Sequence, residues 1–281
     1  MMRVLITGVG SYIGQNIAAY LPKDRYEVQE LDVRWGLDES AFAGQDAVIH
    51  VAGIAHQKET PENALLYHKV NCELAVETAR LAKQNGVKQF IFFSSMSVYG
   101  MTTGCITAQT QPAPNTHYGQ SKWEAEQQMA ALADETFRIA TLRPPMIYGR
   151  DCRGNYPRLA SLARKLPVFP KVNNQRSMLY IGTLCAFVEK LLASGKGGLY
   201  FPQNREYVNT TEMVCAVAHS HGKKLLVIPY FGWLISLVAS RVGMAGKVFG
   251  TLTYEMAMSK DFADAGQMHF EKTIQMTEDK R

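Results

Sequence analysis

Apolar residues are arranged along this chain in two alternating patterns. Short runs rich in Val, Ile, Leu and Phe are typical of strands buried on both faces, and apolar residues at every third or fourth position are typical of amphipathic helices. These patterns predict strands at 2–7, 26–31, 46–50, 89–94, 137–143 and 199–201. They predict helices at 15–21, 71–84 and 182–194. Strands that alternate with helices favour a parallel sheet with right-handed crossovers, so the predicted fold class is α/β.

A glycine-containing turn at residues 8–14 stands between the first predicted strand and the first predicted helix. A helix N-terminus offers free N–H groups and the positive end of a dipole, so a strand, a glycine turn and a helix in this order favour a phosphate site. Asp32 follows the second predicted strand, 18 residues after Gly14. A carboxylate there can accept hydrogen bonds from the ribose hydroxyls of an adenine dinucleotide. The N-terminal part of the chain therefore predicts a dinucleotide site.

Tyr118 lies 23 residues after Ser95, which stands at the end of a predicted strand. Lys122 follows Tyr118 by four positions. On a helix they share one face, so the ammonium is expected to favour the phenolate and to lower a pKa that is near 10 in isolation. A tyrosine tuned in this way can move a proton to or from a sugar hydroxyl near neutral pH. Taken alone, the pair is explained equally well by an ordinary solvated helix face.

Four sequence blocks in the correct order resemble the extended short-chain dehydrogenase/reductase superfamily, specifically its nucleotide-sugar epimerase/dehydratase family. The blocks are TGVGSYIG at 7–14, DAVIHVAG at 46–53, SSMSVYG at 94–100 and YGQSK at 118–122. The resemblance extends from Thr7 to about Tyr200. It implies a catalytic triad of Ser95, Tyr118 and Lys122.

The same resemblance implies NAD as the cofactor and a nucleotide-sugar as the substrate, with no metal. The implied cofactor residues are Gly8, Gly10, Ser11, Tyr12, Ile13, Gly14, Asp32, Arg34, Val51, Ala52, Gly53, Asn71, Lys122 and Pro145. The implied substrate residues are Ser95, Met96, Tyr118 and Arg176, of which Arg176 is similar to the family's arginine that binds the pyrophosphate. Asp32 favours NAD over its 2′-phosphorylated form, and Arg34 acts in the opposite direction.

The chain departs from the family pattern at several positions. Ser11 replaces the middle glycine of the turn, although its N–H and hydroxyl can still be offered to phosphate. Only 13 residues separate Asp32 from Asp46, too few for the additional strand with which relatives hold adenine. Met146 stands where many epimerases carry a substrate-binding asparagine. The segment after Ser95 lacks the acidic pair of the family's dehydratases, which argues against dehydration.

The resemblance also implies a division of the chain into two domains. We expect a Rossmann domain, with a doubly wound parallel sheet, at 1–149 and 176–203, and a smaller C-terminal substrate-binding lobe at 150–175 and 204–281. After residue 149, glycines and prolines separate short pieces of chain, which is where relatives leave the sheet. Asn209 begins a capping-box-like sequence before a predicted helix at 213–221.

Charge is concentrated in one segment of the chain, although the net charge is only +5. Residues 138–176 contain nine basic residues and one acidic residue, a local balance of +8. A diphosphate substrate calls for converging cations, which explains this balance, and a simple solvated surface is the alternative. A nucleic-acid partner is not expected, because no aromatic interleaving or nucleic-acid motif accompanies the charge.

The five cysteines are odd in number and lack metal-ligand spacing, and Met1 leads directly into a core strand without a signal peptide. A cytoplasmic location is therefore expected. An apolar run at 225–239 is interrupted by Pro229 and Gly232 and is shorter than the roughly twenty residues needed to cross a bilayer. No transmembrane span is expected. A buried helix is favoured, and in-plane membrane contact through 225–241 and a homodimer are left open.

These observations lead to a first hypothesis and two alternatives. The first is an NAD-dependent epimerase of a UDP-hexose or UDP-N-acetylhexosamine, which forms a 4-keto intermediate after Tyr118 removes the C4 hydroxyl proton. The second is an NAD(P)H-dependent reductase of a 4-keto nucleotide-sugar that uses the same triad once. The third is a catalytically silent NAD(P)-binding regulatory protein, against which the intact triad argues.

Overall fold

The chain folds into two compact units, seen in a computed structural model that describes residues 1–55, 57–229, 250–262 and 264–279. The first unit consists of Met1–Gly100, Gln111–Pro144 and Leu184–Pro202. The second consists of Met101–Thr110, Pro145–Thr183 and Gln203–Arg281.

The first unit contains a six-stranded sheet in which every pair of neighbouring strands is parallel. Its strands are β1 (Met2–Thr7), β2 (Tyr26–Leu31), β3 (Ala47–His50), β4 (Gln89–Phe93), β6 (Arg138–Leu142) and β10 (Gly198–Tyr200). They lie in the order β10-β6-β4-β3-β1-β2. The chain therefore changes direction across the sheet between β1 and β3, which is where ligands bind in such folds. The predicted doubly wound parallel sheet is confirmed.

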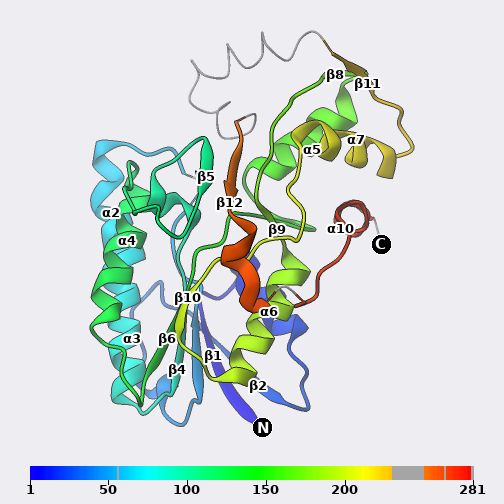
Figure 1. Ribbon diagram of the computed structural model, residues 1–281. Helices are drawn as coiled ribbons and strands as arrows, with labels where there is room; N and C mark the ends of the chain where they lie inside the picture. The colour runs from blue at the N-terminus through cyan, green and yellow to red at the C-terminus, as the bar shows by residue number, and fades with distance from the viewer. Residues whose placement is uncertain (56, 230–249, 263, 280–281) are drawn as a thin grey trace. The chain divides into compact units, whose positions relative to one another are not determined.

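Helices cover this sheet on both faces (Figure 1). One face packs against α3 (Leu74–Gln84) and α4 (His117–Ala130), and α6 (Ile181–Ser194), whose residues from Leu184 onward belong to this unit, covers the other. The core between the sheet and α3 and α4 consists of side chains with almost no exposed surface, including Leu5, Val48, Phe90, Phe92, Ala75, Ala79, Ala125 and Met129. Each large side chain of this kind contributes roughly 1.5–3 kcal/mol by leaving water.

The helix predicted to begin at residue 71 begins earlier. A 3-10 turn, η2 (Pro61–Asn63), leads into α2 (Ala64–His68), then into one turn of π-helix, η3 (Lys69–Glu73), and finally into α3. The Asn63 side chain accepts a hydrogen bond from the Thr60 amide at 2.9 Å. Proline at the first position of the turn suits a helix start, because its missing N–H would have no intrahelical partner there.

The short connection between β2 and β3 contains only a 3-10 turn, η1 (Glu39–Phe42), and no additional strand. This agrees with the 13-residue spacing in the sequence. The additional strand expected from the resemblance to relatives is therefore absent from this connection.

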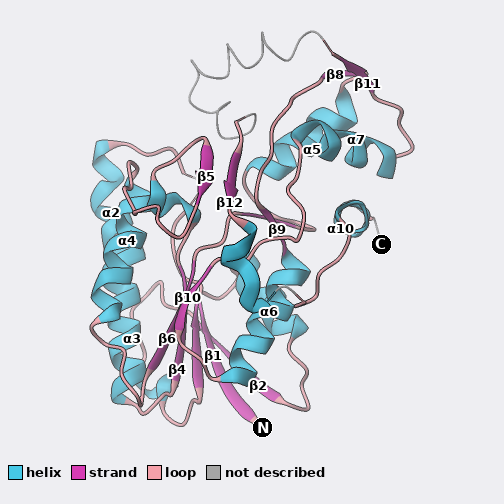
Figure 2. Cartoon of the chain, viewed as in Figure 1, coloured by secondary structure: helices cyan, strands magenta, loops and turns pink. Residues whose placement is uncertain are grey.

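In the part of the chain that the structure describes, the second unit contains α-helices, a 3-10 helix, η5 (Met256–Phe262), and short pairs of parallel strands (Figure 2). The α-helices are α5 (Asn155–Lys165), α7 (Thr210–Ser220) and α10 (Phe270–Glu278). The strand pairs are β7 (Met146–Tyr148) with β9 (Met178–Tyr180), β8 (Val168–Pro170) with β11 (Leu226–Ile228), and β5 (Gly104–Ile106) with β12 (Leu252–Tyr254). The Asn209 side chain caps α7 by accepting from the amides of Thr211 at 2.8 Å and Glu212 at 3.2 Å.

The bounds of the two units differ from the expected domains. Residues 101–110, 145–149, 176–183 and 203 belong to the second unit. Within it, β7 pairs with β9 and β5 pairs with β12. The assignment of cofactor to one domain and substrate to the other stays a prediction.

The apolar run at 225–239 is only partly described. Leu226–Ile228 forms strand β11 rather than the expected helix, because it pairs with Val168–Pro170. Residues 230–249, and with them most of the predicted membrane contact at 225–241, lie outside the described residues. Among the helices that the structure describes, none is long and apolar enough to cross a membrane.

Candidate active site

The turn after β1 brings two loops of the first unit into close contact. Gly8 has φ +97° and Gly10 has φ +74°, a backbone region that glycine adopts without steric cost. A Cβ atom on Gly8 would lie 3.0 Å from the Cα and N atoms of Ala52. The glycine turn and the loop after β3 thus meet at the switch point of the sheet, and a glycine is needed for that approach.

Ser11 has a different role from the one expected. It is the N-cap of α1 (Tyr12–Tyr20), and its Oγ accepts a hydrogen bond from the Gly14 amide at 3.2 Å. Its own N–H donates to the Gly8 carbonyl oxygen at 3.1 Å inside the turn, and its contact with a cofactor stays a prediction. The positive end of α1 still lies at this turn, with Tyr12 and Ile13 in its first turn.

Asp32 and Arg34 form an ion pair just beyond the end of β2. The distance between Arg34 Nη2 and Asp32 Oδ2 is 2.6 Å, and that between Arg34 Nε and Asp32 Oδ1 is 2.9 Å. Hydrogen bonds from Arg34 lower the pKa of the Asp32 carboxyl to about 2. The carboxylate expected to accept from the ribose is therefore charged and already has a cationic partner.

Asn71 makes hydrogen bonds with the loop that follows β3. Its Oδ1 accepts from the Ile54 amide at 2.8 Å, and its Nδ2 donates to the Ile54 carbonyl at 3.1 Å and to Ser121 Oγ at 3.2 Å. The residue has no exposed surface and lies in the π-helical turn η3. A Cβ on Gly53 would come within 2.9 Å of Asn71 Oδ1. Asn71 thus joins the Gly53 loop to helix α4.

The start of α4 is fixed by a carboxylate that sequence analysis missed. Glu59 accepts from the His117 amide at 2.8 Å and from the Tyr118 amide at 3.2 Å, and Thr116 Oγ1 accepts from the Gly119 amide at 3.0 Å. These contacts satisfy amides at the helix start, where the dipole favours negative charge. Glu59 is 58 positions before His117, and no local sequence signal connects them.

The three predicted catalytic residues converge in the first unit. Tyr118 and Lys122 lie one turn apart on α4, and Ser95, which follows β4 and caps the 3-10 turn η4 (Met96–Tyr99), forms a hydrogen bond with the Tyr118 phenol. Lys122 is 5% exposed, and its Nζ lies 4.8 Å from the centre of the Phe92 ring. The helical spacing therefore places the pair as the sequence predicts.

The expected lowering of the Tyr118 pKa is wrong for the protein without ligands. Burial raises the pKa of the phenol, and the hydrogen bond with Ser95 opposes this only in part. Burial also lowers the pKa of Lys122 to about 8, against the opposing effect of Glu126. The helical spacing indicated proximity, but the dehydrated surroundings of both side chains decide the direction of these shifts.

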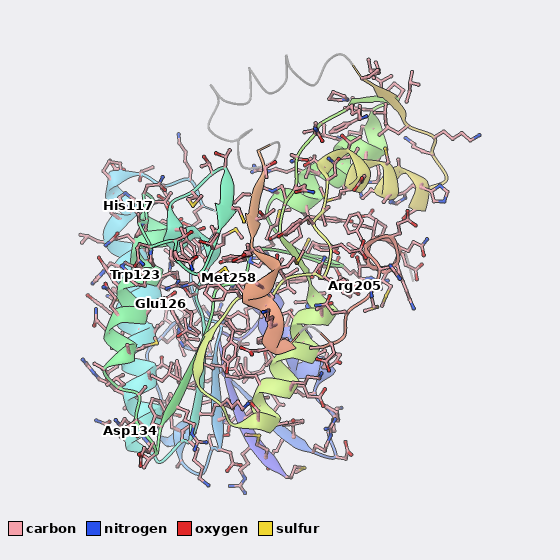
Figure 3. All side chains as sticks on the ribbon, in the orientation of Figure 1. His117, Trp123, Glu126, Asp134, Arg205 and Met258 are labelled. Atoms are coloured by element: carbon pink, nitrogen blue, oxygen red, sulfur yellow. The ribbon has the colours of Figure 1, made fainter. Side chains whose placement is uncertain are left out.

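A buried ion pair, also missed by sequence analysis, connects the elements that carry the triad. Arg143, at the end of β6, is joined to Glu126 of α4 by contacts of 2.5 Å (Nη2–Oε2) and 3.0 Å (Nε–Oε1). Arg143 Nη1 donates to Tyr99 Oη at 2.7 Å, and Ser94 Oγ donates to Glu126. Glu126 and the neighbouring Trp123 are seen on α4 in Figure 3. The pair ties α4 to β6 and to the segment that carries Ser95.

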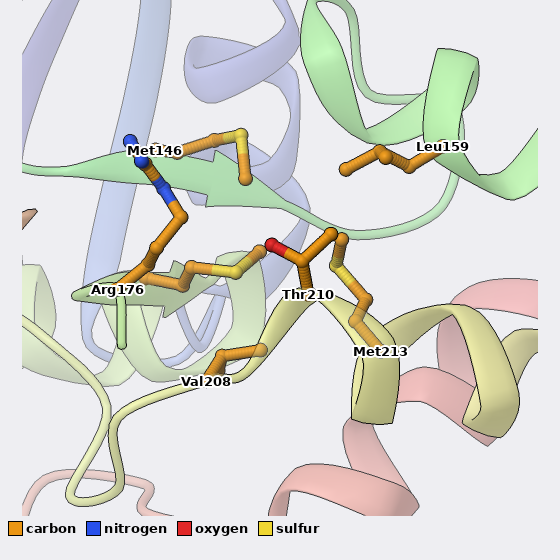
Figure 4. A pocket seen from close by; sticks show the side chains of 7 residues that line it. Met146, Leu159, Arg176, Val208, Thr210 and Met213 are labelled. Carbon is orange, nitrogen blue, oxygen red and sulfur yellow. The ribbon is translucent and has the colours of Figure 1, made fainter. Parts of the chain in front are cut away.

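Arg176, in the second unit, lines a small cavity. Its Nη1 donates to the Gly250 carbonyl at 2.7 Å, and its buried Nε has no hydrogen-bond partner among the residues that the structure describes. Burial lowers its pKa to about 10. The cavity beside it is too narrow to admit a water molecule and is lined by Met146, Leu159, Arg176, Met178, Val208, Thr210 and Met213 (Figure 4). Pro145, expected at the cofactor, also belongs to this unit.

One group of potential metal ligands occurs in the first unit. The ligand atoms of His68, Cys72 and Glu124 lie within 4.8 Å of one another. His68 Nδ1 is hydrogen-bonded to Glu124 Oε2 at 2.8 Å, and Cys72 Sγ accepts from Gln128 at 3.3 Å. Hydrogen bonding accounts for these contacts, and burial raises the pKa of the Cys72 thiol to about 11, which disfavours the thiolate that a metal requires.

The parallel sheet, the glycine turn at its switch point and the Ser-Tyr-Lys group together define a dinucleotide-binding protein of the short-chain dehydrogenase/reductase class. Residues 4–200 match the model of the NAD dependent epimerase/dehydratase family. The chain belongs to this family, which confirms the resemblance seen in the sequence.

Named relatives include epimerases of two kinds. The chain is 29% identical over 290 residues to a UDP-glucose 4-epimerase of Vibrio cholerae, covering 92% of this chain and 88% of that protein. It is 30% identical over 240 residues to the N-acetyl-alpha-D-glucosaminyl-diphospho-ditrans,octacis-undecaprenol 4-epimerase of Escherichia coli O157:H7, covering 81% and 72%. Its fold is similar to that of a UDP-glucuronic acid 4-epimerase from Bacillus cereus solved with NAD, with a TM-score of 0.77, 17% identity and coverage of 99% and 96%.

Proposed function

We propose that this protein is an NAD-dependent 4-epimerase of a diphosphate-linked sugar, with a UDP-hexose or UDP-N-acetylhexosamine as the first substrate to test. The observation that carries the proposal is the convergence of Ser95, Tyr118 and Lys122 beside the carboxyl edge of a parallel sheet. Membership of the family and the two 4-epimerases among its relatives support it.

The glycine turn and its surroundings fit a dinucleotide. Gly10, at φ +74°, has open space where a side chain would project, and the N-terminus of α1 lies directly behind it. A phosphate close to the backbone needs both features, because a side chain at this point would stand in its way. Gly8, Gly10, Tyr12, Ile13 and Gly14 are the residues proposed to hold the cofactor phosphates.

Tyr118 is proposed to take the proton of the sugar C4 hydroxyl and to return it after the hydride has been delivered to the opposite face. Bound NAD supplies the acceptor and donor of the C4 hydride, so the cycle passes through a 4-keto sugar without net oxidation. Ser95 orients the phenol through their hydrogen bond. Because burial raises the pKa of Tyr118 in the free protein, this role requires that pKa to fall when cofactor and substrate bind.

A lipid-diphosphate sugar is the second candidate substrate. The pocket beside Arg176 is lined by three methionines, Leu159 and Val208, with Thr210 as the other polar residue. This lining is apolar, but the cavity is too narrow to hold a ligand in this conformation, so the support for this candidate is the 4-epimerase of a polyprenyl-diphosphate sugar among the relatives. Arg176 is proposed to bind the diphosphate in either case, through charge-assisted hydrogen bonds.

Turnover of the Tyr118→Phe variant tests the catalytic proposal. We expect it to fall by about 10²- to 10⁴-fold, the usual contribution of a positioned acid or base, while NAD binding is kept. Tyr67→Phe is a matched control, because this buried ring lies 6.4 Å from that of Tyr118 and its hydroxyl donates to the Gln57 carbonyl oxygen at 3.4 Å. Near-native turnover of Tyr118→Phe on the true substrate would show that the catalytic assignment is wrong.

Identification of the bound dinucleotide and of the substrate completes the test. The purified protein is denatured and the released nucleotide is identified, since tightly held NAD is expected of a cycle that regenerates its own cofactor. Interconversion of 4-epimers is then measured by chromatography on UDP-hexoses, UDP-N-acetylhexosamines and a polyprenyl-diphosphate sugar. Reduction of a 4-keto sugar with consumption of added cofactor, and no epimerisation of any of them, would replace the proposal with a reductase.

A further inference from the structure

The outward face of the β8–β11 strand pair is apolar. Val168 and Leu226 are register partners, and the Leu226 amide donates to the Pro167 carbonyl at 3.0 Å. They are 38% and 63% exposed, whereas Phe169, which follows Val168 and points to the opposite face, is 3% exposed. Side chains alternate between the two faces of a sheet, and a solvated face normally carries polar residues. This pair therefore exposes the kind of side chain that is usually buried.

The end of α5 extends this surface. Leu162 and Leu166 are one helical turn apart, with the Leu166 amide donating to the Leu162 carbonyl at 2.9 Å, and they are 40% and 39% exposed. Leu166 is separated from Val168 only by Pro167. Figure 1 shows α5 beside β8 and β11. We call Leu162, Leu166, Val168 and Leu226 the apolar surface. Single exposed apolar residues are common, but four on adjoining segments indicate an interaction site.

Basic residues surround the apolar surface. Four lysines with exposed side chains stand on the same segments, namely Lys165, Lys171, Lys223 and Lys224. The Lys171 amide donates to the Ile228 carbonyl at 3.0 Å, which places this lysine at the end of β11. The sequence contains no acidic residue between Asp151 and Glu189 or between Glu212 and Glu255. An apolar patch with a cationic rim is complementary to an anionic lipid surface.

The sequence continues directly from β11 into further apolar residues. Residues 229–239 read PYFGWLISLVA and are followed by Arg241 and Lys247. Tyrosine and tryptophan favour the boundary between lipid headgroups and acyl chains, and flanking basic residues favour anionic lipid. This composition is continuous in sequence with the apolar surface and has the same chemistry.

We propose that the apolar surface and its lysine rim bind the face of an anionic phospholipid bilayer. The aliphatic side chains enter the headgroup region, and the lysines contact lipid phosphates. Binding is peripheral and reversible, and it is independent of which sugar the active site uses. The proposal therefore stands or falls separately from the proposed reaction.

Vesicle flotation of the purified full chain tests the proposal. We expect the protein to float with vesicles of phosphatidylcholine and phosphatidylglycerol, to bind phosphatidylcholine alone at least about tenfold more weakly, and to be released by salt. The variant L162Q/L166Q/V168T/L226T should bind the anionic vesicles at least about tenfold more weakly. Gln keeps helix propensity and Thr keeps strand propensity at these exposed positions.

Two further variants distinguish the contribution of the lysines from that of the apolar side chains, and both from the general effect of replacing exposed leucines. K165Q/K171Q/K224Q should lose the preference for anionic over neutral vesicles while its circular dichroism and thermal unfolding stay those of the wild type. L65Q/L66Q is the matched control, because Leu65 and Leu66 are 81% and 45% exposed in the other unit. This control should bind vesicles as the wild type does.

Three outcomes would overturn the proposal. The wild type could bind neither type of vesicle. The four-residue variant could be folded and still bind anionic vesicles as tightly as the wild type, which would place lipid binding elsewhere on the chain. Sedimentation could show that L162Q/L166Q/V168T/L226T converts a dimer into a monomer without any change in vesicle binding, which would make this face a contact between two copies.

Discussion

Replacing Glu126 with Gln should destabilise the first unit strongly, because it removes the carboxylate that pairs with the buried Arg143 guanidinium. The carboxylate and guanidinium are joined by contacts of 2.5, 3.0 and 3.1 Å, and their side chains are 7% and 5% exposed. Removing one partner of such a pair costs about 3–5 kcal/mol, since the remaining charge keeps its desolvation penalty. The partners that Arg143 keeps include the Tyr99 hydroxyl at 2.7 Å and the Trp123 ring at 5.3 Å.

Urea unfolding of Glu126→Gln, Arg143→Met and the double variant Glu126→Leu/Arg143→Met measures this effect. Each single variant should lower the free energy of unfolding by about 3–5 kcal/mol, and the double variant should recover most of the loss because no unpaired charge remains. Glu126→Gln should also lower the pKa of Lys122 below about 8, since Glu126 favours the ammonium. A loss below about 1 kcal/mol in Glu126→Gln would refute this reasoning, because that is the value of an exposed pair.

The remaining predictions concern cofactor choice, substrate binding and pH. Arg34→Ala should increase the preference for NAD over its 2′-phosphorylated form, and Asp32→Ala should reduce it, because the carboxylate repels the phosphate and the guanidinium attracts it. Competitive titration that shows no change in either variant would contradict this prediction. Arg176→Ala should weaken UDP binding by roughly 2 to 4 kcal/mol in calorimetry and leave NAD affinity unchanged, whereas equal UDP affinities would remove Arg176 from the site. His50 has its pKa lowered by burial from 6.5 to about 3, so the unfolded chain binds more protons between these values and stability falls as the pH decreases through this window. The loss is at most about 1.4 kcal/mol per pH unit, and His50→Gln should show a shallower dependence of the urea midpoint on pH.

Many of the features around the triad could not be predicted because they depend on contacts between distant residues. Glu59 reaches the start of α4 across 58 positions, and Arg143 reaches Glu126 across 17 positions and two different elements. Neither carboxylate belongs to a motif with local spacing. The π-helical turn that places Asn71 against Ile54 and Ser121 is likewise invisible to a 3.6-residue periodicity, since it adds a residue to one turn.

Local patterns of the sequence by themselves determined the order along the chain of the six strands of the parallel sheet, the glycine turn, and the shared face of Tyr118 and Lys122. These follow from apolar periodicity, from glycine's backbone freedom and from helix geometry, all of which act over a few residues. Only the tertiary structure decided the directions of the pKa shifts in the site. Burial raises the pKa of Tyr118 and lowers that of Lys122, against the direction that their spacing suggests for the phenol. The reason is that desolvation depends on every segment packed around a side chain, and neighbours in sequence supply only a small part of those segments.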